Sequence, residues 1–221
     1  MKLVHPDIDI PIDFETCHCY NLIVENPKAF FSLTKDIIDQ ANGNDGDFIL
    51  SKNSKILDID KNCLVLYDFF NISFSSKKIV NLISNSVLDL LKAKDFIEDF
   101  ANINQQFILL NEKVSRELDF PIEFEDEFSY DSFVKFSNYK ISPSKNLAER
   151  IFDYVNLYYK IVGISTVIFV NLNLFLPQKD IEALVKQLSY MQLNILFVDA
   201  VDILNIKDCK KIIIDNDLCV I

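Results

Sequence analysis

Glycine is scarce in this chain, and its scarcity excludes the usual phosphate-binding loop. The only glycines are Gly43, Gly46 and Gly163, and the pattern GxxxxGK followed by Ser or Thr does not occur. Backbone amides of that loop hold the β- and γ-phosphates of a nucleotide. Asp68 and Asp199 follow apolar runs, where a magnesium-binding carboxylate often lies in an open α/β sheet. Without the loop, we interpret both aspartates as polar strand ends.

Histidine and other markers of catalysis are equally sparse. His5 and His18 are the only histidines, both lie near the N-terminus, and a GxSxG nucleophile elbow is absent. The sequence therefore predicts a protein that is not an enzyme.

Long apolar runs and CxxC pairs are also missing. No run reaches the roughly 18 apolar residues that span a bilayer, and the N-terminus lacks the pattern of a signal peptide. The five cysteines are an odd number and mostly lie in apolar runs, which favours reduced, buried thiols. Cys17-His18-Cys19 looks like part of a zinc site but lacks a second ligand pair. We expect a cytoplasmic protein.

Basic residues are outnumbered by acidic ones. The chain has 22 Lys and Arg against 33 Asp and Glu, a formal net charge of -11. Phosphate contacts need Lys and Arg, so the balance argues against nucleic acid. Net charge is a sum, however, while binding depends on one face of the molecule. A nucleic-acid function therefore requires a local basic surface, or a cation that supplies one.

Apolar residues are abundant, and their pattern predicts an α/β fold with a mostly parallel sheet. Half of the residues are hydrophobic. Continuous apolar runs at 19–24, 64–67, 167–170, 195–198 and 212–214 are typical of parallel strands covered on both faces. Residues 181–188 between the third and fourth runs have helical spacing, so these two strands should be parallel neighbours in a β-α-β unit.

The middle of the chain has helical rather than strand periodicity. Apolar stripes run through residues 79–91, 96–110 and 147–159, and Gly163 is a plausible C-cap of the last helix. These stripes are most simply helix–helix core. They predict a helical leg, residues 72–163, inserted into an α/β head made of residues 1–71 and 164–221.

The strongest local charge feature is an acidic segment between residues 117 and 131 that contains no Lys or Arg. Its carboxylates are Glu117, Asp119, Glu123, Glu125, Asp126, Glu127 and Asp131. Calcium prefers about six to eight oxygen ligands in a flexible segment, but the spacing is not that of an EF-hand. A solvated acidic loop and a calcium site both remain open.

Basic residues cluster modestly in the helical middle. They are Lys77, Lys78, Lys92, Lys94, Lys113, Arg116, Lys145 and Arg150. One interpretation is a solvated helix face. Repeated around a symmetric ring, the same residues could instead form a basic channel.

The order of these segments resembles the Csn-two family, a CRISPR-associated family, nearly from end to end. The segment LVLYDFFN at 64–71 precedes the helical leg and the acidic turn, and VIFVN at 167–171 and NILFV at 194–198 follow them. The best-matching stretch is 164–221. The turn with Glu117, Asp119, Glu123, Asp126 and Glu127 resembles the calcium-binding segment of the family.

The resemblance implies a specific picture. Members are homotetrameric rings whose head resembles a degenerate P-loop NTPase without a working nucleotide site. They bind linear double-stranded DNA through the central hole without sequence preference, and Ca2+ supports the assembly. They act with the CRISPR integrase pair and the effector nuclease during spacer acquisition in type II-A antiviral defence. The alternatives are a degenerate or active P-loop-like NTPase and a calcium-dependent protein scaffold that does not bind DNA.

Overall fold

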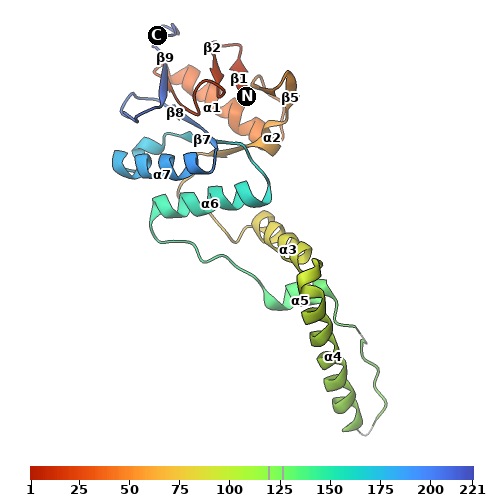
Figure 1. Cartoon of the computed structure of the whole chain (residues 1–221). Coiled ribbons are helices and arrows are strands. Elements are labelled where there is room, and N and C mark those ends of the chain that lie inside the picture. The colour runs from red at the N-terminus through yellow and green to blue at the C-terminus, as the bar shows by residue number, and fades with distance from the viewer. Residues whose placement is uncertain (119, 126) are drawn as a thin grey trace. The chain divides into compact units, whose positions relative to one another are not determined.

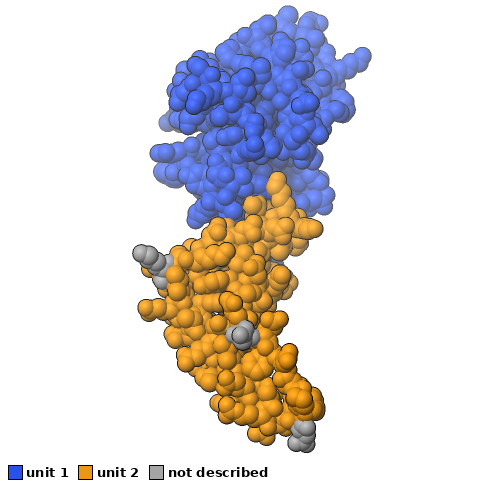
Figure 2. All heavy atoms as spheres, turned by 90° about the vertical axis from the view of Figure 1, so that its right-hand side faces the viewer, with its two compact units in different colours: residues 1–72, 143–221 blue, residues 73–142 orange. Residues whose placement is uncertain are grey.

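The computed structural model describes residues 1–118, 120–125 and 127–221, with the side chain of Lys94 left out. The chain forms two compact units, which Figure 2 colours separately. Unit 1 comprises residues 1–72 and 143–221, and unit 2 comprises residues 73–142. Helix α6 (Leu147–Ile161) belongs to unit 1, although its stripe was assigned to the leg, and Gly163 follows it with a φ of 78°. Its apolar side packs against α7 (Gln178–Tyr190), a partner that periodicity alone does not reveal.

A five-stranded parallel sheet forms the centre of unit 1. Its strands are β6 (Cys63–Leu66), β7 (Thr166–Val170), β8 (Asn194–Asp199), β3 (Cys19–Val24) and β9 (Lys210–Ile214), in that spatial order. Every neighbouring pair is parallel. All residues of β3, β7 and β8 are buried. The prediction of a buried parallel sheet from continuous apolar runs is therefore confirmed.

The parallel sheet is covered on both faces (Figure 1). On one face, α1 (Pro27–Ala41) contributes Leu33 and Ile37 to a core shared with Tyr20 and Leu22 of β3. The other face carries the stacked rings of Phe169 and Phe197, whose centroids are 5.5 Å apart. Helix α7 connects β7 to β8 after the short 3-10 helix η1 (Leu172–Leu174). The predicted β-α-β unit is thus confirmed.

Unit 1 also contains a second, antiparallel sheet, which was not predicted. Its strands are β2 (Ile8–Asp13), β1 (Lys2–His5), β4 (Ile49–Lys52) and β5 (Lys55–Leu57), and the short helix α2 (Ile59–Asn62) leads into β6. Leu3, Ile12 and Leu50 face the core, while the intervening residues face solvent. Such short strands with several charged residues give a weak sequence signal.

Unit 2 consists of α3 (Lys77–Leu91), α4 (Lys94–Arg116) and α5 (Tyr130–Ser137). Ser76 caps α3 by accepting a hydrogen bond from the Ile79 amide, as its position predicts. After α4 the chain turns back, so that Phe128 stacks on Phe107 and Tyr130 stacks on Phe100. Helix α5 then packs against α3. Within the described ranges, no helix is both long and apolar enough to cross a membrane.

Candidate functional site

Three lysines of α3 and its C-cap share one exposed helix face. Successive helical residues are rotated by about 100°, which places Lys92 between Lys77 and Lys78 within an arc of roughly 100°. The opposite side of α3 carries Ile79, which is fully buried. Residues 77–92 contain a single carboxylate, Asp89, which lies about 20° beyond Lys78 in the same rotation. Lys77 and Lys78 lie about 21 Å along the axis from Lys92. This face therefore carries an excess of positive charge, strongest at the start of α3, although the whole chain is acidic.

The remaining predicted basic residues are not gathered on this face. Lys94 begins α4, and its side chain lies outside the structural description. Lys113 and Arg116 lie at the other end of α4, about 30 Å along the helix axis. Arg116 pairs with Glu112 at 3.4 Å. Lys145 and Arg150 belong to unit 1, where Arg150 Nε donates to the Ser144 carbonyl at 3.1 Å.

The predicted calcium ligands are only partly placed by the structure. Glu117 is the C-cap of α4, and Glu123 and Glu127 are exposed in the segment that returns along it. Asp119 and Asp126 lie outside the described residues. Among the residues that are described, no group of three or more His, Cys, Asp or Glu side chains is arranged to hold a metal ion. The oxygen donors suit calcium chemically, and two of the five predicted ligands lie outside the described residues, so calcium binding by this segment stays a prediction.

The apolar stripe of α4 is only half covered. Phe96, Phe100, Ile103, Phe107, Leu110 and Val114 follow one another at alternating intervals of four and three residues, which is a coiled-coil spacing. Phe100 is buried against Tyr130 and Phe133. Phe96, Ile103 and Leu110 remain 43%, 43% and 62% exposed. The sequence interpretation of this stripe as helix–helix core therefore holds for one side only.

The two aspartates at the carboxyl ends of strands have different surroundings. Asp68 accepts hydrogen bonds from the amides of Phe70 and Asn71, both at 3.2 Å, and so closes a tight turn. Asp199 is completely buried, and both carboxylate oxygens lack a hydrogen-bond partner among the described residues. Burial, followed by repulsion from Asp202, raises the pKa of Asp199 to about 7. Asp68 is thus engaged in a local turn, and Asp199 is enclosed away from solvent.

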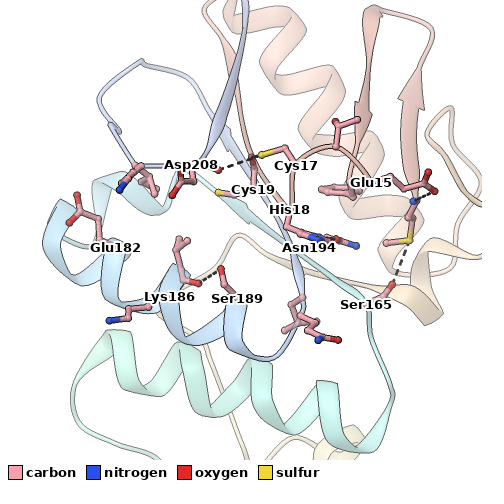
Figure 3. A pocket seen from close by; sticks show the side chains of 18 of the residues that line it. Glu15, Cys17, His18, Cys19, Ser165, Glu182, Lys186, Ser189, Asn194 and Asp208 are labelled. Carbon is pink, nitrogen blue, oxygen red and sulfur yellow. Dashed lines mark hydrogen bonds and ion pairs between the residues drawn. The ribbon is translucent and has the colours of Figure 1, made fainter.

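A cavity of about 1040 Å³ lies in unit 1 at the amino-terminal ends of β3 and β8, opposite to the edge that carries Asp68 and Asp199. Cys17, His18, Cys19, Lys186, Asn194 and Asp208 are among its lining residues (Figure 3). The ring of His18 hydrogen-bonds the Asn194 side chain, with 2.9 Å between Nδ1 and Oδ1. Sequence reasoning missed this cavity because its walls come from both chain ends; the Cys17-His18-Cys19 run was the one available signal.

Comparison with known families agrees with the sequence resemblance. The family model described as CRISPR-associated protein (Cas_Csn2) matches residues 40–218. No curated protein matches the chain. The matched range includes all of unit 2, α6, α7 and four of the five strands of the parallel sheet. Because the match covers most of its residues, the chain belongs to the Csn-two family of CRISPR-associated proteins.

Proposed function

We propose that the protein is a non-enzymatic, ring-forming double-stranded-DNA-binding protein that acts in spacer acquisition in type II-A CRISPR defence. The observation that carries the proposal is the locally basic face of Lys77, Lys78 and Lys92 in a chain of this family. In the cytoplasm it would act with the CRISPR integrase pair and the effector nuclease. A ring of four copies would repeat this face around one hole, so that few lysines per chain suffice to neutralise several phosphates.

The exposed side of the α4 stripe supports assembly. Phe96, Ile103 and Leu110 recur every seven residues and thus lie on one side of the helix. Exposed apolar surface that is contiguous along a helix marks an interaction site. A homotetramer with closed symmetry would remove this surface from water.

The same proposal includes a head related to P-loop NTPases that has lost its nucleotide site. The parallel sheet supports the relation, and the absent glycine loop supports the loss. The Asp68 carboxylate accepts hydrogen bonds from the amides of its own turn, and the Asp199 carboxylate is buried away from solvent. An equilibrium nucleotide-binding assay separates this proposal from the NTPase alternative, because specific binding of ATP would favour the latter.

Binding of linear DNA should depend on the lysine face of α3. Replacing Lys77 and Lys92 with glutamine should weaken binding of linear duplex by at least about 10-fold near 0.1 M salt. It should also lower the slope of log affinity against log salt by about one or more, since each lost phosphate contact releases fewer counterions. The wild type should bind linear duplexes of unrelated sequence equally and closed circles poorly, as measured by electrophoretic mobility shift.

The matched control replaces Lys28 and Lys55, two exposed lysines of unit 1, with glutamine. It changes the net charge equally and should leave the affinity and slope nearly unchanged. Equal weakening by both variants would show that only the net charge matters. Equal retention of circles and linear duplex would argue against encirclement, and calcium-dependent assembly without DNA binding would favour the scaffold alternative.

Calcium should promote the assembled form through the acidic segment 117–131, because a cation would relieve the repulsion among its carboxylates. Calcium should therefore raise the melting temperature more than magnesium does, by mass action on the state that binds it. Replacing Glu117, Asp119 and Glu123 together with alanine should abolish this difference in a thermal-shift experiment.

A matched variant removes Asp95, Glu98 and Asp99, which are exposed carboxylates of α4 outside the segment. It should keep the full calcium response. If the segment variant melts with an unchanged calcium dependence, the cation binds elsewhere.

A further inference from the structure

Two cysteines from opposite ends of the chain lie side by side at one end of the parallel sheet. Strands β3 and β9 are paired in parallel from Tyr20 opposite Lys210 onward. When this register is extended by one residue, Cys19, the first residue of β3, is opposite Cys209, the residue just before β9. Neighbouring strands lie about 4.8 Å apart, which is within the range of about 4.4–6.8 Å between Cα atoms that a disulfide spans. Residues paired in this way also point to the same face of the sheet.

The thiols interact in the reduced protein. Interaction with the Cys209 side chain, followed by burial and the nearby Cys17 sulfur, raises the pKa of Cys19. The Cys17 thiol is engaged elsewhere, because its Sγ donates hydrogen bonds to the backbone carbonyl oxygens of Cys19 at 3.1 Å and Asp208 at 3.4 Å. Cys19 is buried and Cys209 is half-buried, so Cys209 is the member of the pair that an oxidant can reach first.

We propose that Cys19 and Cys209 form a reversible disulfide when the protein meets a small-molecule disulfide. Cys209 is half-buried and lines a small hollow with Leu204 and Lys211, while Cys19 lines the larger cavity at the amino-terminal ends of the strands (Figure 3). The segment before Cys209 forms one wall of that cavity through Asn205, Ile206, Lys207 and Asp208. The disulfide would link this segment covalently to β3.

The chemistry is two successive thiol–disulfide exchanges. The Cys209 thiolate attacks one sulfur of the oxidant R–S–S–R, which forms a Cys209–S–S–R mixed disulfide and releases one R–S⁻. Cys19 then attacks Cys209 Sγ and releases the second R–S⁻. The two protein protons end on the two R–SH products, so the oxidant gains the two electrons that the cysteines lose.

The other two cysteines provide internal references. Burial raises the pKa of the Cys63 thiol in β6 to about 12, so this thiol should remain unreactive. Cys219 is exposed beyond β9 and should form only a mixed disulfide with the oxidant. The disulfide between Cys19 and Cys209 would close a loop that includes most of the chain, and long loops give the largest stabilisation in the chain-entropy description.

The test uses the full chain, with oxidised glutathione as the oxidant, alkylation of the remaining thiols, and non-reducing peptide mapping. In the Cys219→Ser protein we expect a disulfide between the peptides that contain Cys19 and Cys209. We also expect a rise in melting temperature of about 5–10 °C that dithiothreitol reverses. The Cys17→Ser variant should form the same bond, which distinguishes Cys19 from its neighbour in the same peptide. Cys209→Ala should abolish it.

Peptide mapping of the Cys219→Ser protein tests whether the disulfide forms even if the Cys209→Ala variant fails to fold. Free, alkylatable Cys19 and Cys209 after exposure to the oxidant would overturn the proposal. So would a disulfide that joins Cys209 to Cys17, because the strand register would then not select the pair. The inference is independent of DNA binding, since none of these cysteines belongs to unit 2.

Discussion

Aspartate at both Ile103 and Leu110 should convert the proposed tetramer into a monomer. Burying a fully exposed aliphatic side chain contributes about 1.5–3 kcal/mol, and these two are 43% and 62% exposed, so losing both should weaken association by on the order of 100-fold per chain. The added charges increase this loss, because they would be buried without partners. Light scattering in calcium should change from about four chain masses to one, where one chain is 25.6 kDa.

The fold of unit 2 should survive this change, because both side chains are already substantially exposed in the single chain. Phe136→Asp is the matched control, since Phe136 lies on α5 outside the stripe and is 84% exposed. It should leave the assembled mass unchanged. An unchanged mass for the Ile103 and Leu110 variant would show that the α4 stripe is not the assembly surface. Loss of assembly should also abolish retention of linear DNA.

Replacing Asp199 with asparagine should stabilise the protein at neutral and alkaline pH. The folded-state pKa of about 7 lies above the ordinary value of 3.8, so the folded state binds the proton more tightly than the unfolded state. This stabilisation is fully present below pH 4 and is lost as the pH rises towards 7. Well above pH 7, where Asp199 is ionised in both states, the free energy of unfolding is lower by about 4 kcal/mol than at pH values where Asp199 is protonated in both states. Asparagine cannot ionise, so the gain should be about 2–4 kcal/mol at pH 8 and small at pH 4.

Urea unfolding of both proteins between pH 4 and pH 8 measures this difference. Asp202→Asn is the control, since Asp202 adds the secondary repulsion on Asp199 and pairs with Lys211 at 2.6 Å. Its effect should stay below about 1 kcal/mol, because solvent screens this partly exposed pair. A stability difference for Asp199→Asn that does not vary with pH would show that Asp199 does not titrate in this range.

The spacing of apolar residues predicted most of the structure of the head. The run at residues 19–24 has no polar phase that repeats every second residue, and in the structure it is a strand buried on both faces. The antiparallel sheet was not predicted, because its strands are short and alternate between buried and exposed residues. In Lys2–His5 only two of the four residues face the core, and so short an alternation is easily lost among flanking charges.

The candidate site was predicted as a set of residues rather than as a surface. The lysines of α3 share a face because helical rotation is a local property, so their grouping follows from residue numbers. Lys145 and Arg150 were assigned to the same leg, yet they belong to unit 1. Where α6 packs depends on a non-local partner, α7, that its own stripe does not specify.

The sequence by itself determined the α/β class, the parallel strands, the missing phosphate loop and the family, because each depends on local pattern or on segment order. Tertiary structure alone decided which side of the α4 stripe stays exposed. It also decided that Asp199 is enclosed without a hydrogen-bond partner among the described residues and that β3, which begins at Cys19, pairs with β9, which follows Cys209. Burial and strand register are properties of residues far apart in the chain. Local patterns of hydrophobicity constrain them weakly, so they appear only when the whole chain is folded.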